Sequence, residues 1–367
     1  MKWVSLLHNK IPSSEVGAKI VEWYSCILSN SYKEATLLKN EVQQMIKSMQ
    51  EDDKILAYYS LVEYRHNNIL DKSSKTEPLE DQFKFVESEL DHYLKYLYYF
   101  VSGQDEFNKQ KYRTAVKMFR KAERLLENVK DETEEADFLG YMGYAYYRID
   151  QYLFALSYLE QAETAFRRLG SVYNAVNNKQ VAGAIYVELK QYEKGEQILQ
   201  ECLEESESST MTGIILKAIG LSKFTQSKYE SAVYYFQKAL EIEEINNSYY
   251  GMKALTELSH AQFKLEKIEE ARNTFKKAKA SAQFYESFEF KARCKFIEGL
   301  YILDNQNMVD ESINELIEEG LLFEVCELAE ELIEIYEKKG DNENVIKYYK
   351  IAYSAKLKPE MIGDGQE

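Results

Sequence analysis

The clearest candidate for chemistry in the first part of this chain is a junction that carries an amide beside a run of acids. Gln50 is followed directly by Glu51, Asp52 and Asp53. An amide next to carboxylates can orient a water molecule, which suits hydrolysis of an acyl phosphate, where positioning and charge do most of the work. A run of acids is equally typical of a solvated segment that caps a helix. From these residues alone, both interpretations stay open.

A second set of candidates mixes aromatic and polar side chains on the first helices of a series of predicted hairpins. In a repeat superhelix these helices line the concave face. A short extended peptide would need amides for its main chain and a carboxylate for a basic side chain. For any single residue, a solvated helix surface is the alternative. The candidates are Tyr144, Tyr147, Arg148, Asn177, Gln180, Glu188, Lys217, Thr225, Lys253, Thr256 and His260.

Metal, disulfide and phosphate-loop chemistry is not indicated. The four histidines have no metal-ligand spacing between them. The four cysteines are far apart, so we expect buried thiols in a reducing compartment rather than disulfides or zinc. Gly140 and Gly143 lie inside a predicted helix with no strand before it, which does not make a phosphate loop. We therefore expect no cofactor.

The elements that would position the candidates repeat along the chain. A small residue is followed after twelve positions by another, then after four by a large residue and after three by a small one. Antiparallel helices approach closely only where side chains are tiny, and a large residue fills the space beside the crossing. The pattern returns every 37 to 40 residues and predicts tetratricopeptide repeats. Its copies are Gly103, Ala115, Phe119, Ala122; Gly143, Ala155, Leu159, Ala162; Gly183, Gly195, Leu199, Cys202; Gly220, Ala232, Phe236, Ala239; and Ser259, Ala271, Phe275, Ala278.

Composition and helical spacing predict an all-α chain with an N-terminal three-helix bundle and a right-handed repeat superhelix. Only 3 prolines and 15 glycines occur in 367 residues, which favours helices. We predict the bundle over residues 1–71, with its second helix reaching Met49. A polar linker and a connecting helix would follow over residues 72–93. The repeats, about six hairpins, would occupy residues 94–367 and end in a hairpin that turns at Gly340.

The charge balance bears on the partners. A net charge of −16 argues against nucleic acid as a direct ligand and favours a basic partner or a small cationic peptide. No apolar stretch approaches the ~18 residues of a membrane span, and the first dozen residues do not form a signal peptide. We expect a cytoplasmic protein.

Part of the chain outside the repeats resembles a known family. Residues 11–24, 49–66 and 70–71 are similar to the opening of the Rap family of Bacillus regulators. The resemblance continues through residues 98–103 to the C-terminal pair at 348–349 and covers essentially the whole chain. Because it includes the non-repeat part, the match is specific.

The resemblance implies a function in quorum sensing and in the regulation of sporulation or competence. The bundle and linker, residues 13–92, would bind a response regulator and either remove its aspartyl phosphate or block its DNA-binding domain. A short secreted and reimported peptide would bind the repeats and release the regulator, and any magnesium ion would be carried by that regulator. The implied regulator-binding residues are Glu51, Asp52, Tyr58 and Tyr59.

The junction departs from the phosphatase members of the family. Those members resemble Met-Glu-Glu-Asp-Gln here, and the final Gln, which enters the regulator's active site, falls on Asp53. An ionised carboxylate accepts but cannot donate, and it repels a phosphate. Gln50 lies one helical turn earlier, on a similar face if the segment is helical, and could substitute. A phosphatase and a purely non-catalytic interaction regulator both remain open.

The implied peptide site is kept in part. The acidic residue of the third repeat that holds the peptide's basic side chain is present as Glu188. An Asn of the fourth repeat that clamps the peptide backbone falls on Ala218, and a further acidic position falls in the basic stretch 293–295. The cognate peptide would therefore differ, or the response to peptide would be weak. A peptide-receptor transcription factor is a further alternative, but residues 1–70 lack its basic recognition helix.

Overall fold

The structure, a computed structural model, describes residues 10–70 and 91–357. Nearly all of the predicted linker and connecting helix therefore lies outside the described residues. The chain divides into two compact units, Met1–Ala145 and Tyr146–Glu367. This division falls inside one helix of the repeats, whereas the sequence suggested a boundary near residue 71.

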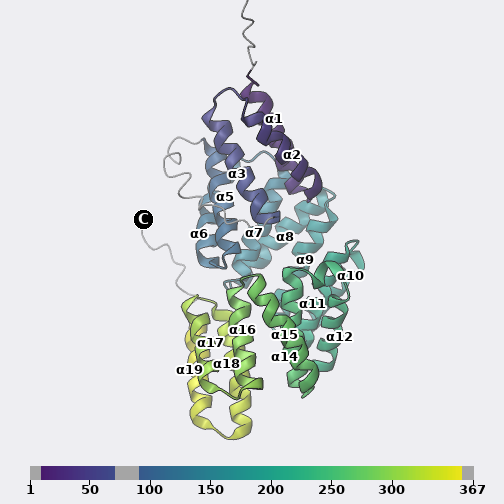
Figure 1. The fold of residues 1–367 in the computed structure, drawn as a ribbon, viewed down its shortest axis with the longest axis vertical. Coiled ribbons are helices and arrows are strands. Elements are labelled where there is room, and N and C mark those ends of the chain that lie inside the picture. The colour runs from purple at the N-terminus through teal and green to yellow at the C-terminus, as the bar shows by residue number, and fades with distance from the viewer. Residues whose placement is uncertain (1–9, 71–90, 358–367) are drawn as a thin grey trace, which may run out of the picture. The chain divides into compact units, whose positions relative to one another are not determined.

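The first unit holds the predicted three-helix bundle together with the first repeat helices. Its helices are α1 (Ser13–Leu28), α2 (Tyr32–Ile46), α3 (Asp53–Leu70), α5 (His92–Asn108), α6 (Tyr112–Glu123) and α7 (Glu132–Tyr147, the last two residues belonging to the second unit), with a 3₁₀ turn at Leu126–Asn128 (Figure 1).

Trp23 is the largest side chain buried in the bundle, with none of its surface exposed. Its Nε1 donates a hydrogen bond to Nδ1 of His66 at 3.0 Å, so α1 and α3 share a polar contact inside an apolar core. Burial lowers the pKa of His66 to about 4, which keeps the imidazole neutral and able to accept this bond. Trp23 and His66 therefore join α1 to α3 within the core of the bundle.

The second unit contains the remaining repeats. Its helices are α8 (Tyr152–Arg168), α9 (Val172–Glu188), α10 (Tyr192–Glu205), α11 (Ser209–Thr225), α12 (Tyr229–Leu240), α13 (Glu243–Asn246), α14 (Tyr249–Lys264), α15 (Ile268–Phe284), α16 (Phe288–Ile297), α17 (Gln306–Glu318), α18 (Leu322–Lys339) and α19 (Asn342–Leu357), with a π-helical turn at Glu298–Ile302.

The repeat spacing works as the sequence predicted. A Cβ added to Gly103 would lie 2.4 Å from the ring of Phe119, and one added to Gly220 would lie 2.7 Å from the ring of Phe236. Both rings are completely buried. Only a glycine leaves room for the large residue of the facing helix at this distance, so the small and large positions determine where the paired helices cross.

The turns inside the hairpins repeat with the same period. In five hairpins the second helix is preceded, two residues earlier, by a residue in the left-handed conformation, with φ between 57° and 64°. These residues are Gln110, Asp150, Lys190, Ser227 and Glu266. None is a glycine, so sequence reasoning that relies on glycine to mark turns did not find them.

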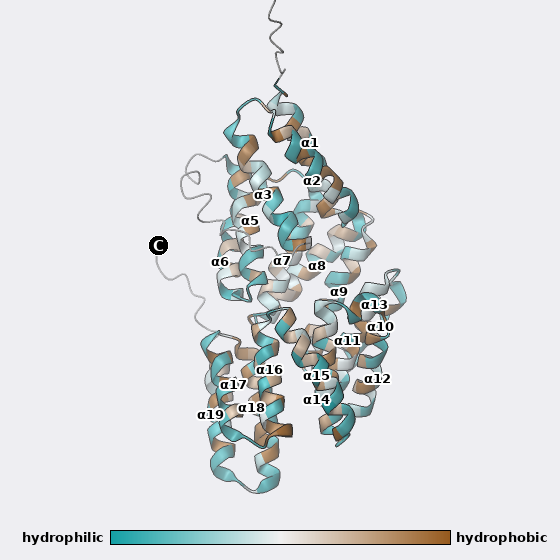
Figure 2. Cartoon of the chain, viewed as in Figure 1, coloured by the Kyte–Doolittle hydropathy of each residue, from teal (hydrophilic) through white to brown (hydrophobic). Residues whose placement is uncertain are grey.

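The all-α prediction is confirmed for the described residues. In Figure 2 most helices show both teal and brown along one ribbon, as amphipathic helices do. The last hairpin pairs α18 with α19 and turns at Gly340, where φ is 73°. None of the described helices combines the length and the apolarity needed to span a bilayer.

Candidate functional site

The acidic junction is a non-helical connection between α2 and α3. Asp52 caps α3: its Oδ1 accepts hydrogen bonds from the backbone N–H of Lys54 at 3.1 Å and of Ile55 at 3.2 Å. The bond from Ile55, together with one from Ser13, lowers the pKa of Asp52. Glu51 and Asp53 are exposed, and Asp53 is the first residue of α3. One acid of the run therefore holds the helix start, and two project into water.

The expected helical relation between Gln50 and Asp53 is wrong. Helix α2 ends at Ile46, and Met49, predicted to be helical, forms an isolated parallel bridge with Ile11. The backbone N–H of Gln50 donates to the carbonyl of Ile11 at 2.9 Å, which keeps the segment extended. Gln50 is exposed, but it does not share a helix face with Asp53.

The two tyrosines predicted to contact a regulator have different environments. Tyr58 is only 8% exposed, and its ring packs edge-on against Tyr24 and Tyr93. Tyr59 is half-buried, and its hydroxyl donates to Glu63 at 2.6 Å. Tyr58 therefore supports the bundle from inside, and only Tyr59 presents part of its side chain to a partner.

A buried polar network in the first unit was missed by sequence reasoning. Arg65 of α3, 2% exposed, donates to the hydroxyl of Tyr24 and to the carboxylate of Asp137 on α7. Glu134 of α7 accepts from Tyr24 at 2.9 Å and from Tyr93 of α5 at 3.1 Å. Burial raises the pKa of Glu134 to about 7, against the opposing effect of these hydrogen bonds. The network ties the bundle to the first repeat helices within the unit.

In the second unit, two tyrosine hydroxyls contact Glu188, the residue that the family resemblance implies as the receptor for a basic side chain. Its carboxylate accepts from the hydroxyl of Tyr147 at 2.5 Å and from that of Tyr152 at 2.9 Å. Burial raises the pKa of Glu188 to about 8, the two hydroxyls oppose that rise, and the more distant Asp150 adds to it while Arg148 opposes it. A cation beside this carboxyl group would favour its ionised form, so the group is suited to receive a basic side chain.

Other residues predicted to contact a peptide lie on helices α7, α9 and α11. Gln180 is 7% exposed, and its Nε2 reaches Asn177 at 3.4 Å. Ala218, 8% exposed, stands where the family's Asn would stand. Lys217 is half-buried on α11. Tyr144 belongs to the first unit, where its ring contacts Tyr141.

Two arginines of the second unit are surrounded by carboxylates. Arg148 donates to Glu289 at 3.0 Å and to Glu324 at 2.8 Å. Arg293 donates to Glu327 at 2.5 Å and lies 3.7 Å from Glu257 and 3.6 Å from Glu289. These pairs join α14, α16 and α18 through charges that are mostly buried. The basic stretch 293–295 therefore contributes a buried arginine that is held by acids.

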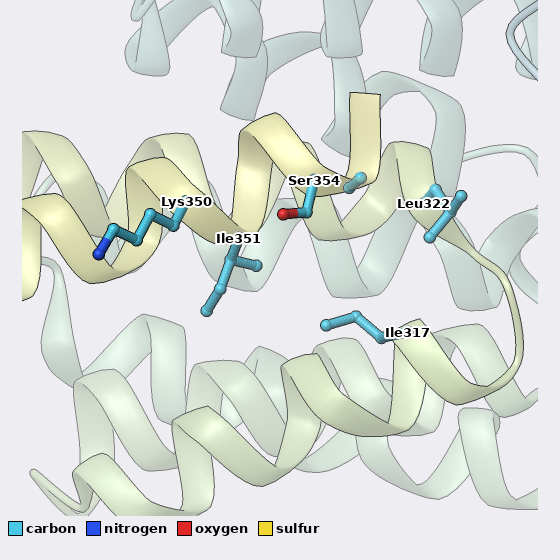
Figure 3. A pocket seen from close by; sticks show the side chains of 6 residues that line it. Ile317, Leu322, Lys350, Ile351 and Ser354 are labelled. Carbon is cyan, nitrogen blue, oxygen red and sulfur yellow. The ribbon is translucent and has the colours of Figure 1, made fainter. Parts of the chain in front are cut away.

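A small pocket near the end of the chain offers different chemistry. It has a volume of about 200 Å³ and is lined by Ile317, Leu322, Lys350, Ile351, Ser354 and Ala355 (Figure 3). In the view Ile317 and Ile351 point toward one another, and the amine of Lys350 points away along α19. The lining is mainly apolar and shares no residue with the cluster around Glu188. Among the described residues, no group of three His, Cys, Asp or Glu side chains could hold a metal ion.

Comparison with known proteins identifies the family. The family model described as "response regulator aspartate phosphatase H, N terminal" matches residues 10–71, and a tetratricopeptide-repeat model matches residues 176–209 and 253–283. Response regulator aspartate phosphatase I of Bacillus subtilis (strain 168) is 26% identical over 98% of this chain and 95% of its own length. The chain belongs to the Rap family.

A solved Rap structure agrees with this assignment over nearly the whole chain. It is a Rap protein in complex with competence and sporulation factor, 27% identical, with a TM-score of 0.88 over 95% of this chain and 99% of that one. The helical-repeat fold of this chain is therefore shared with a Rap protein that was solved in complex with competence and sporulation factor.

One similar protein carries a different name. Type II methyltransferase M.CeqI of Rhodococcus hoagii is 33% identical over 98% of this chain and 71% of its own length. The name is that protein's own, and the match leaves the rest of its length unaligned. The residues that align are those that the Rap proteins also match, so the family assignment is unchanged.

Proposed function

We propose that this chain binds a response regulator through residues 13–92 and that a short basic peptide, bound in the repeats, controls that binding. The observation that carries the proposal is the exposed junction Gln50, Glu51 and Asp53 inside the segment that the Rap N-terminal model matches. The bundle, residues 1–71, and the repeats, residues 94–367, would act as two functional parts joined by residues 72–93.

The peptide side of the proposal rests on Glu188. Its carboxyl group is held by two tyrosine hydroxyls, and burial raises its pKa. A cationic side chain bound there would favour the ionised form and make a charge-assisted hydrogen bond with it. The relative solved in complex with competence and sporulation factor supports a peptide as the ligand class. Because Ala218 replaces the backbone-clamping Asn, more of the affinity would depend on side-chain charge.

For the junction, we infer that dephosphorylation of the bound regulator is slow or absent. Asp53 is exposed at the start of α3 and brings a negative charge where phosphatase relatives place Gln. A carboxylate there repels a phosphoaspartate and donates no hydrogen bond to the attacking water. Gln50 belongs to an extended segment rather than to α3, so it does not replace that Gln by helix geometry.

The test uses the response regulators of the host, each purified, phosphorylated with acetyl phosphate and followed for loss of phosphate. We expect the wild type to bind one of them and to leave its phosphate largely intact. Asp53→Gln should raise the rate about tenfold for each 1.4 kcal/mol of transition-state stabilisation recovered. Glu127→Gln, the same charge change at an exposed acid of the same unit outside residues 13–92, is the control and should leave the rate unchanged.

Two results would contradict this proposal. A wild type that removes phosphate as fast as Asp53→Gln and is indifferent to Gln50→Ala would show that position 53 does not set the rate. If the wild type binds none of the regulators, the proposal that its partner is a response regulator is contradicted.

A further inference from the structure

The acids of the arginine cluster in the second unit are already occupied. Glu289 and Glu324 both accept from Arg148, and Glu257 and Glu327 both face Arg293. Each arginine thus has at least two carboxylates within 4 Å. Any further cation beside this cluster must share acids that are already paired, which weakens the ion pairs available to it.

Two lysines, Lys217 and Lys253, lie beside the arginine cluster. Lys217 of α11 is half-buried, and within residues 10–70 and 91–357 its amine has no hydrogen-bond or ion-pair partner. The Lys253 amine of α14 lies 5.0 Å from the ring centre of Tyr249 and 5.2 Å from that of Phe290, with no carboxylate in ion-pair range among the same residues. Helix α11 contacts α14 directly. Two amines on neighbouring helices are therefore left without an anion.

The electrostatics agree with this geometry. Burial, and after it the charge of Lys253, lowers the pKa of Lys217 to about 8. Arg148 acts in the same direction, and Glu257 and Glu289 only partly oppose it. Burial likewise lowers the pKa of Lys253. An anion between the two amines would raise their pKa values again, because it would stabilise the charged forms that burial and mutual repulsion disfavour.

We propose that Lys217 and Lys253 form a receptor for a carboxylate of the bound peptide. The inference rests on the proposed function and deepens it. Glu188 lies at the end of α9, which packs against α11, so a cation receptor and part of the anion receptor stand on helices that contact each other. A peptide bound there carries a basic side chain at α9 and a carboxylate toward α11 and α14. That carboxylate is either the peptide's C-terminus or an Asp or Glu side chain.

The experiment captures peptides with the full chain from random short-peptide pools made as free acids and as C-terminal amides, and identifies them by mass spectrometry. Titrations then compare each captured peptide with its amidated form and with a form whose acidic side chain is replaced by the matching amide. The variants are Lys217→Met, Lys217→Arg and Lys253→Met. The control is Lys223→Met, a lysine on the same helix that is ion-paired to Glu196 at 2.6 Å.

We expect Lys217→Met to lose affinity by about tenfold or more, Lys217→Arg to keep most of it, and Lys223→Met to behave as the wild type. The loss should disappear when the peptide lacks the recognised carboxylate. Sensitivity to amidation assigns the C-terminus, and sensitivity to the side-chain amide assigns an Asp or Glu.

The lysine receptor is overturned if a captured peptide binds Lys217→Met and Lys253→Met as it binds the wild type, or if removing its carboxylates changes nothing. In that case the peptide still binds, and the proposed function survives. If the wild type captures no peptide from either pool, the proposed function fails, and the receptor fails with it.

Discussion

Arg65 in the first unit and Lys217 in the second are two charged side chains with opposite surroundings. In the first unit Arg65 is enclosed and donates to Tyr24 and Asp137, and the nearby Glu134 accepts from two tyrosines. In the second unit Lys217 is half-buried with no partner among the residues that the structure describes. Satisfied buried charges hold helices together, whereas an unsatisfied one costs stability and is tolerated where a ligand completes it. The comparison favours a structural role for Arg65 and its partners and supports the proposed binding role of Lys217.

The largest expected effect is on the stability of the first unit. Arg65→Met leaves Asp137 without its cation in a buried network, and the loss of one partner of such a pair costs about 3–5 kcal/mol in the free energy of unfolding. Chemical denaturation followed by the fluorescence of Trp23 measures it. Arg124→Met, an exposed arginine of the same unit, is the control and should change stability by less than about 0.5 kcal/mol. Equal free energies of unfolding for the two variants would contradict a structural role of the network.

A second prediction concerns the pH dependence of peptide affinity. The free protein protonates Glu188 below about pH 8, so a peptide that needs the ionised carboxylate binds about tenfold more weakly for each unit below 8. Above about pH 8 Lys217 loses its proton, and affinity for a carboxylate falls again. Titrations from pH 6 to pH 10 should therefore give a maximum near pH 8.

Two variants distinguish the acidic side of the affinity–pH profile from its alkaline side. Glu188→Gln should flatten the acidic limb and leave the alkaline one, and Lys217→Met should do the reverse. A wild-type affinity that is constant between pH 6 and pH 8 would show that Glu188 does not receive a cation.

For the second unit we expect a smaller change in stability, opposite in sign to the change caused by Arg65→Met. The folded pKa of Lys217, about 8, lies below its ordinary value of 10.5, so folding disfavours the charged amine. This penalty is full below pH 8 and disappears as the pH rises from 8 to 10.5. Lys217→Met should thus stabilise the unit at pH 7 by about 1 kcal/mol. This is less than the free energy that corresponds to the whole pKa shift, because the half-buried amine remains partly hydrated. Thermal unfolding measures it, and a destabilised variant would contradict the binding role.

The repeats could be predicted from the sequence because their signal is local. A glycine and an aromatic residue at a fixed spacing bring two helices together, as Gly103 and Phe119 do. Other features depend on contacts between residues distant in the sequence: the bridge between Ile11 and Met49 ends α2 early and removes Gln50 from the helix.

The network of Arg65 was missed for a related reason. Its partner Asp137 lies 72 positions away, and an arginine within a polar stretch gives no sign that it will be buried. Glu134 and Asp137 stand one helical turn apart in α7 beside apolar residues, which is the one local hint that both face the core. The left-handed turn residues, such as Asp150 and Lys190, escaped notice because they are not glycines.

The most direct test of a binding role for the second unit is a charge reversal at Glu188. The full chain and its Glu188→Lys variant are titrated calorimetrically with a peptide captured by the wild type and with the same peptide carrying Glu in place of its basic residue. The account predicts that the wild type prefers the basic peptide and that the variant, folded as judged by its circular dichroism, prefers the acidic one. Equal affinity of both proteins for the basic peptide would contradict it.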